Sequence, residues 1–107
     1  MPRMRKVLIA TQRGPVEVEA EVVRLPVGEK QERFFIHDNG TETVLSHFAS
    51  GWRVGSLGSI RLAAVRWGTG DTITNREAAR RLVEDIIAKH GAESVQRTLA
   101  QVPVINR

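Results

Sequence analysis

The sequence predicts an α+β fold, in which an antiparallel sheet of two hairpins and further strands is followed by a C-terminal helix or helix pair packed on one face. Three observations favour this class. Residues 16–23 largely alternate between apolar and charged side chains, which is typical of a strand with one buried face. Asn39 and Gly40 form a strong hairpin-turn signal. A stripe of apolar residues at helical spacing begins only after residue 74, so strands precede helices.

The predicted sheet lies within residues 1–67. The first hairpin joins "KVLIAT" (6–11) to "VEVEAEVVRL" (16–25) and turns at Arg13–Pro15. The second hairpin is "RFFIHDNGTETVLSHF" (33–48), which turns at Asn39 and Gly40. Further strand material follows in "WRVG" and in "IRLAAVRW" (60–67), although the alanines of the latter leave a short helix open.

The predicted helical region spans residues 74–102. Thr74 and Glu77 have the spacing of a capping box, in which the side chain of each residue accepts a hydrogen bond from the backbone N–H of the other. Gly91 stands where a left-handed helix stop belongs, and a second, shorter helix follows it as far as Pro103. The apolar stripe of the first helix predicts that its buried residues are Leu82, Val83, Ile86 and Ile87.

The size and composition favour a soluble protein of one domain over residues 1–107. The chain has 107 residues, of which 41% are hydrophobic, enough to bury a core without covalent staples. There is no cysteine, which excludes disulfides and thiolate metal sites and fits a reducing compartment. No apolar run approaches the ~18 residues of a membrane span. We therefore expect a cytoplasmic protein with no membrane partner.

The basic charge is unevenly distributed along the chain. The net charge is +4, and 13 of the 16 basic residues are arginine. Residues 15–32 carry a net charge of −3, whereas residues 52–81 carry +4. Arginine enrichment favours phosphate binding, because a guanidinium group forks onto phosphate oxygens. The codon bias of a GC-rich genome explains it equally well at this level.

The two histidines of the second hairpin are candidate metal ligands. A two-residue turn pairs His37 with Glu42 and puts His47 on the opposite face of the hairpin. A three-residue turn pairs His37 with Thr41 and leaves the two histidines about 20 Å apart, at ~3.3 Å per residue. Neither register brings both imidazoles to one ion, so we expect no metal and no cofactor.

A hydrolase site is not expected from this segment either. Ser46 and His47 are neighbours in the sequence, so on a strand their side chains point to opposite faces. A catalytic triad would need Ser50 or Ser56 to fold back on a histidine, together with an acid that the sequence does not single out. We therefore expect a protein that is not an enzyme.

Tryptophan and arginine residues are interleaved between residues 52 and 67. This pattern suits single-stranded nucleic acid, because bases stack on aromatic faces and phosphates pair with guanidinium groups. The alternative is that both tryptophans anchor a core or an interface. The predicted nucleic-acid-binding residues are Trp52, Arg53, Arg61, Arg66 and Trp67, with Arg3, Arg5 and Lys6 as an N-terminal arm.

The segment "SHFASGWRV" resembles a motif of small uncharacterised proteins encoded by bacterial phages and prophages. In that motif a Ser/Thr-His pair is followed, after a short gap, by Ser/Thr-Gly and an apolar residue. The matching residues are Ser46, His47, Ser50, Gly51 and Val54. The resemblance implies a small accessory protein of a mobile element, with no established activity. The order of strands and helix is also similar to that of dimeric single-strand-binding proteins of the transcriptional-coactivator type.

These observations lead to three hypotheses about function. The first is a small non-enzymatic binding protein that binds single-stranded nucleic acid without sequence preference. The second is a homo-oligomeric structural or adaptor protein of a phage or prophage. A long strand edge at residues 16–25 favours a dimer, and the competing explanation is that the three glutamates of this strand guard the edge. The third is an enzyme of unknown type.

Overall fold

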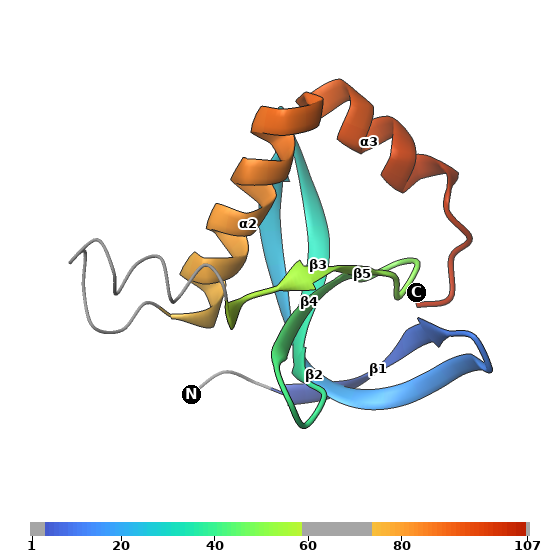
Figure 1. Cartoon of the computed structure of the whole chain (residues 1–107). Helices are drawn as coiled ribbons and strands as arrows, with labels where there is room; N and C mark the ends of the chain where they lie inside the picture. The colour runs from blue at the N-terminus through green and yellow to red at the C-terminus, as the bar shows by residue number, and fades with distance from the viewer. Residues whose placement is uncertain (1–3, 59–73, 107) are drawn as a thin grey trace.

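The computed structural model describes residues 4–58 and 74–106, and these form an antiparallel sheet followed by two helices (Figure 1). The five strands are neighbours in chain order, each paired with the next. This arrangement confirms the α+β class and the order of strands before helices. Residues 60–67, for which strand and helix were both open, lie outside the described residues. The elements are β1 (Met4–Thr11), β2 (Gly14–Val27), β3 (Lys30–Asp38), β4 (Thr43–His47), β5 (Arg53–Ser56), α2 (Asn75–His90) and α3 (Ala92–Gln101).

The long strand β2 changes its buried face halfway along. Val18 and Ala20 face an apolar cluster shared with β1, whereas Val23 and Leu25 are buried on the opposite face, beneath the helices. The change coincides with a change of partner, because β2 pairs with β1 through residues 14–21 and with β3 through residues 21–27. A strand whose buried face switches must shift its alternation by one residue. The prediction of one buried face throughout 16–23 is therefore wrong at Val23.

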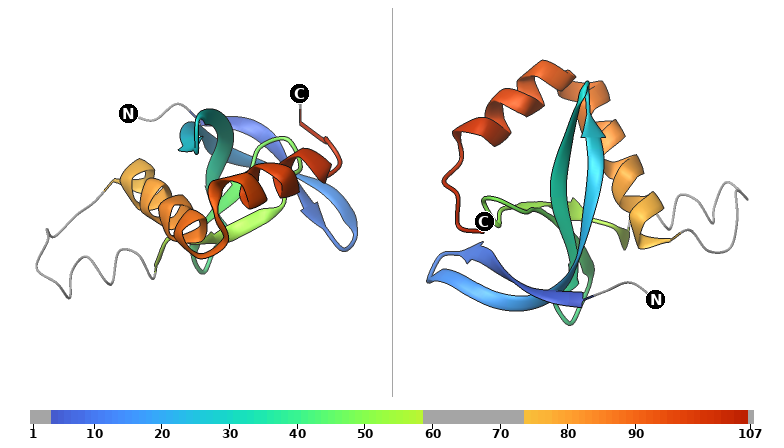
Figure 2. Two further views of the ribbon diagram at one scale, coloured as in Figure 1. Left: turned by 90° about the horizontal axis from the view of Figure 1, so that it is seen from above. Right: turned by 180° about the vertical axis from the view of Figure 1, so that it is seen from behind.

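Both faces of the sheet centre are covered. Phe34 lies in the cluster that α2 and α3 cover, and its neighbour Phe35 lies in the cluster formed with the first hairpin and Phe48. The views show both helices on one side and the β1–β2 hairpin curling away from them (Figures 1 and 2). The helix pair thus packs on one face as expected, while the hairpin itself closes the other.

The second hairpin turns through four residues, because Asp38 pairs with Thr43. Asn39 Oδ1 accepts hydrogen bonds from the backbone N–H groups of Thr41 and Glu42, at 3.0 and 2.9 Å. This side-chain bonding replaces the two-residue turn that Asn-Gly usually favours. Both predicted registers are therefore wrong, since His37 lies opposite Val44 and His47 lies opposite Phe34.

Helix α2 begins and ends where the sequence predicted. Thr74 Oγ1 accepts from the N–H of Glu77 at 3.1 Å, and Gly91 adopts a φ of 83° as the terminating residue. The reciprocal half of the capping box is wrong, because the Glu77 carboxylate accepts from Arg80 and Arg81. The predicted burial is confirmed for Val83, whereas Leu82, Ile86 and Ile87 are only partly buried. The buried face is displaced toward the N-terminal end of the helix, where Ala78 and Ala79 are fully buried.

The displaced face of α2 reflects how closely it approaches the sheet. Alanines at the N-terminal end let the helix lie near β5, where Leu82 Cδ2 is 3.1 Å from the position that a Cβ on Gly55 would take. Ile86, one turn further on, lines an open cavity instead. The predicted second helix is present as α3.

The C-terminal residues and the turn after β4 close the free edge of β1. Ala10 N–H donates to the Gly51 carbonyl at 3.0 Å. The Asn106 side chain accepts from Leu8 N–H and donates to the Leu8 and Phe48 carbonyls, at 2.8, 2.8 and 2.7 Å. One buried amide thereby satisfies the two Leu8 backbone groups that a further strand would otherwise pair, and ties them to the Phe48 carbonyl.

Strand β2 pairs with β1 through its first half and with β3 through its second half, so each half has a strand partner on one side only. The edge on which the expected dimer rested is therefore divided between the two sides of β2, and the dimer stays a prediction. In the part of the chain that the structure describes, no helix is long and apolar enough to cross a membrane.

Candidate nucleic-acid interface

Trp52 and Arg53 are neighbours in the sequence, but their contacts in the structure differ. Trp52 is 52% exposed and lines a shallow hollow with Ala10, Thr11 and Gln12. Arg53 Nη2 lies 2.8 Å from a Glu42 carboxylate oxygen. A hydrogen bond from Ser56, and secondarily the pairing with Arg53, lower the pKa of Glu42 below its usual value. Trp52 is therefore accessible for stacking, whereas the charge of Arg53 is already paired.

Of the two described residues of the predicted N-terminal arm, Arg5 lies in a basic cluster and Lys6 does not. Arg5 and Lys6 are neighbours on β1, so they point to opposite faces. Lys6 Nζ lies 3.8 Å from Glu17, on the acidic outer face of the first hairpin. Arg5 instead lies over the ring of Phe48. The remaining predicted residues, Arg3, Arg61, Arg66 and Trp67, lie outside the described residues.

Two exposed arginines, Arg5 and Arg33, lie over the Phe48 ring, and a third, Arg24, projects from the same face of the sheet. We call Arg5, Arg24 and Arg33 the arginine cluster. The guanidinium carbon of Arg33 lies 4.3 Å from the centre of the Phe48 ring, and that of Arg5 lies 5.5 Å from it. The ring is only 1% exposed, so the two cations cover it. Phe48 N–H donates to the Arg33 carbonyl at 3.0 Å, which fixes the ring beside β3.

Arg24 enters the cluster through the strand register. It lies directly opposite Arg33 in the β2–β3 ladder, so both side chains project from the same face. Like charges in this position repel each other. Among residues 4–58 and 74–106, no carboxylate pairs with any arginine of the cluster. The cluster is therefore an uncompensated positive surface, which suits an anionic partner.

Arg24 and Arg33 were not predicted as site residues, because their grouping depends on pairing across strands. Arg24 comes just after the change of buried face at Val22 and Val23. It therefore lies on the face that carries apolar residues earlier in β2. The net negative charge of residues 15–32 also gave no sign of Arg24, because the glutamates at 17, 19 and 21 lie on the face opposite to it. The shift in alternation was the one signal that could have revealed it.

His47 lies between two polar side chains, Ser50 from the turn after β4 and Glu32 from β3. His47 Nδ1 lies 2.9 Å from Ser50 Oγ, and His47 Nε2 lies 3.6 Å from a Glu32 oxygen. Ser50 is one of the two serines that would have to fold back on a histidine in a triad, and its hydroxyl does contact His47. The acid, Glu32, was not identified, because it comes from the neighbouring strand β3.

The contacts of Ser50 favour a structural role for this arrangement. Its side chain is 1% exposed, so a substrate has no path to Oγ in this conformation. The same Oγ accepts from the Trp52 N–H at 3.2 Å. His47 N–H and carbonyl are also bonded across the turn, to Trp52 and Gly51. His47, Ser50 and Gly51 of the phage-like segment thus hold one tight turn against β1.

The buried histidines lie on opposite faces of the sheet and have shifted pKa values. Burial lowers the pKa of His47, and the Glu32 carboxylate offsets part of this shift. Burial also lowers the pKa of His37; Asp38 opposes the shift, and Arg53 adds to it. Within residues 4–58 and 74–106, no three acidic or histidine side chains are grouped as metal ligands.

We expect the free energy of unfolding to fall between about pH 7.5 and about pH 5.5, because two buried histidines must be protonated. Their stabilisation is complete above the unfolded pKa of about 6.5 and is lost as pH falls through the lower folded-state values. Urea unfolding at both pH values measures it. The double variant His37→Gln/His47→Gln should lose most of the difference, whereas exposed His90→Gln should keep it. An unchanged midpoint in the native chain would contradict the prediction.

Comparison with known proteins adds no family assignment: no family model, curated protein or solved structure matches the chain.

Proposed function

We propose that this protein is a small non-enzymatic binding protein that holds single-stranded nucleic acid by its phosphates on the arginine cluster. The observation that carries the proposal is the Arg24–Arg33 pair, in which two like charges face each other without a described carboxylate. A phosphate between them would relieve their repulsion and accept hydrogen bonds from both guanidinium groups. Because such contacts read no base, binding is independent of sequence.

Trp52 supports a second contact along the same strand. It lies beside Thr11 and Gln12 at the end of β1, whereas Arg5 lies near its start. The two contacts are about 20 Å apart at ~3.3 Å per residue, so an extended strand of several nucleotides is needed to reach both. A base stacked on the exposed indole would add about 1–3 kcal/mol. Longer oligonucleotides are therefore expected to bind more tightly than very short ones.

The proposed function is consistent with a cytoplasmic protein. We expect the protein to act in the cytoplasm, where single-stranded nucleic acid occurs, and we keep an accessory role in a phage or prophage as a prediction. The homo-oligomeric adaptor stays the rival hypothesis. Light scattering with and without oligonucleotide separates the two, because the rival requires a dimer or larger assembly without any nucleic acid.

The test is fluorescence anisotropy of a labelled oligothymidylate at low salt. Arg33→Gln and Arg24→Gln should each weaken binding by about tenfold, which corresponds to one charge-assisted contact of about 1.4 kcal/mol. Arg97→Gln is the matched control, since it removes the same charge from exposed helix α3. It should change the affinity by less than about twofold, as expected for a distant charge in screening salt. Equal losses in all three variants would contradict a localised site.

A further inference from the structure

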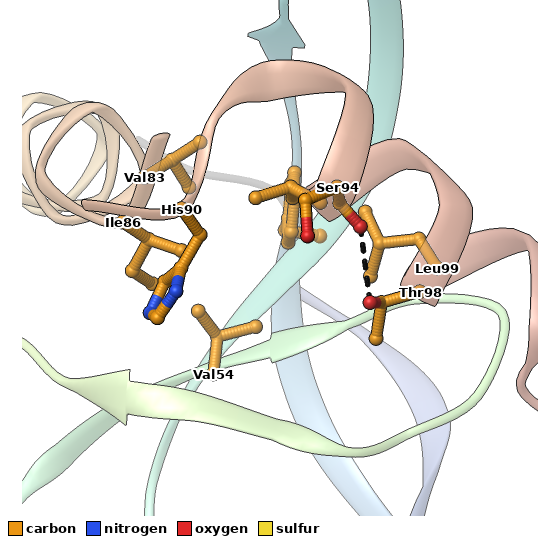
Figure 3. A pocket seen from close by; sticks show the side chains of 9 residues that line it. Val54, Val83, Ile86, His90, Ser94, Thr98 and Leu99 are labelled. Atoms are coloured by element: carbon orange, nitrogen blue, oxygen red, sulfur yellow. Dashed lines mark hydrogen bonds between the residues drawn. The ribbon is translucent and has the colours of Figure 1, made fainter. Parts of the chain in front are cut away.

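An open cavity lies between the two helices and the sheet, on the opposite side of the sheet from the arginine cluster. Its volume is about 360 Å³. Ile86 and His90 form the α2 wall, Leu99 and Thr98 form part of the α3 wall, and Val54 of β5 lies between them (Figure 3). The volume is at the lower end of the roughly 300–1,000 Å³ found for small-molecule sites.

Helix α3 is attached to the rest of the fold at its middle and beyond its end. Midway along the helix, the Gln96 side chain donates to the Val27 carbonyl. Beyond its end, Ile105 and Asn106 donate from their backbone N–H groups to the Ala49 carbonyl, at 2.6 and 3.1 Å. No residue of α3 is fully buried, although Val95 and Leu99 pack partly on the apolar cluster. Val95 and Leu99 thus contact the apolar cluster and also line the cavity.

Polar groups occur at only a few points of this apolar lining. His90 projects from the α2 wall, and Ser94 and Thr98 lie on the α3 wall (Figure 3). Thr98 Oγ1 donates to the Ser94 carbonyl at 3.0 Å. Among the described residues, neither the His90 ring nor the Ser94 hydroxyl makes a hydrogen bond. An imidazole N–H and a hydroxyl on facing walls can both donate to one acceptor group.

We propose that this cavity binds a small aliphatic carboxylic acid. The hydrocarbon chain would lie against Val54, Ile86 and Leu99, and the carboxylate would accept hydrogen bonds from His90 and Ser94. The cavity is too small for the apolar face of a partner helix, whose diameter with side chains is about 10–12 Å. A chain of several methylene groups matches both the volume and the single pair of polar donors. This site is independent of the proposed nucleic-acid function.

The experiment is isothermal titration of the full chain with sodium octanoate and, separately, with 1-octanol. Octanoate should bind the native protein, and His90→Gln or Ser94→Ala should weaken it by about threefold to tenfold, the effect of one lost hydrogen bond. Binding of octanol should change by less than about twofold in His90→Gln, since its hydroxyl does not require both donors. Failure of octanoate to bind would overturn the proposal. Binding of octanol alone would overturn the carboxylate as its polar group.

A filled cavity provides the second test. Val54→Phe should abolish octanoate binding, because the larger ring occupies the space of the hydrocarbon chain. Val16→Phe is the matched control, since Val16 is exposed on β2 and remote from the lining. Should Val54→Phe fail to fold, methyl spectra of the native protein decide the matter. Octanoate must then shift the methyl signals of Ile86, Val95 and Leu99, and unchanged signals would overturn the proposal.

Discussion

Replacing Gly51 with alanine is expected to destabilise the protein by about 2–5 kcal/mol. The residue has a φ of 70°, and left-handed backbone costs a non-glycine residue about 1–2 kcal/mol. A Cβ at this position would lie 2.7 Å from the Leu8 carbonyl oxygen and 2.9 Å from the Ala10 nitrogen. Because both atoms belong to the β1 backbone, they cannot move aside as a flexible side chain would, and overpacking adds about 1–3 kcal/mol. Urea unfolding measures the loss.

Gly14→Ala is the control for this prediction. Gly14 also has a positive φ, of 103°, but no atom lies within 4 Å of its prospective Cβ. Its substitution should therefore cost only the conformational part, about 1–2 kcal/mol. Equal losses at Gly14 and Gly51 would show that the turn does not press against β1 as the structure indicates.

Phe34→Ala and Phe35→Ala are each expected to lower the free energy of unfolding by about 3–5 kcal/mol. The two residues are adjacent on β3, so their side chains point to opposite faces of the sheet. Both are fully buried, one beneath the helices and one beneath the first hairpin. A sheet with one solvent-exposed face would show a large loss at only one of them.

Chemical denaturation with a matched apolar control tests this double burial. Val16→Ala removes an apolar side chain that is already exposed, and it should change stability by less than about 0.5 kcal/mol. If an alanine variant does not fold, Phe34→Leu and Phe35→Leu give smaller losses that are still comparable. A near-zero effect at either phenylalanine would contradict the two-cluster core.

Local signals predicted the elements whose determinants lie close together in the sequence. The Thr74 cap and the Gly91 stop set the ends of α2 because each depends on backbone groups within one turn. The turn of the second hairpin was located correctly but not its length. Four hydrogen bonds accepted by the Asp38 and Asn39 side chains decide that length, and turn propensity alone does not include them.

The parts that sequence patterns missed depend on contacts between distant segments. Val22 and Val23 mark the change of buried face in β2, but the change makes sense only once β1 and β3 are known to pair with different halves. The arginine cluster needs that same register, because Arg24 and Arg33 meet across a ladder. Trp52 and Arg53 were grouped as sequence neighbours, yet Glu42 pairs with the arginine from another loop.

The most direct test of the arginine cluster is the salt dependence of oligothymidylate binding by the native protein and by Arg24→Gln/Arg33→Gln. Each phosphate contact on a single strand contributes about −0.7 to the slope of log affinity against log salt. If each arginine holds one phosphate, the double variant should have a slope shallower by about 1.4, with its fold intact by circular dichroism. A native protein that binds with an unchanged slope in the double variant, or that does not bind at low salt, would contradict the proposed phosphate-binding role.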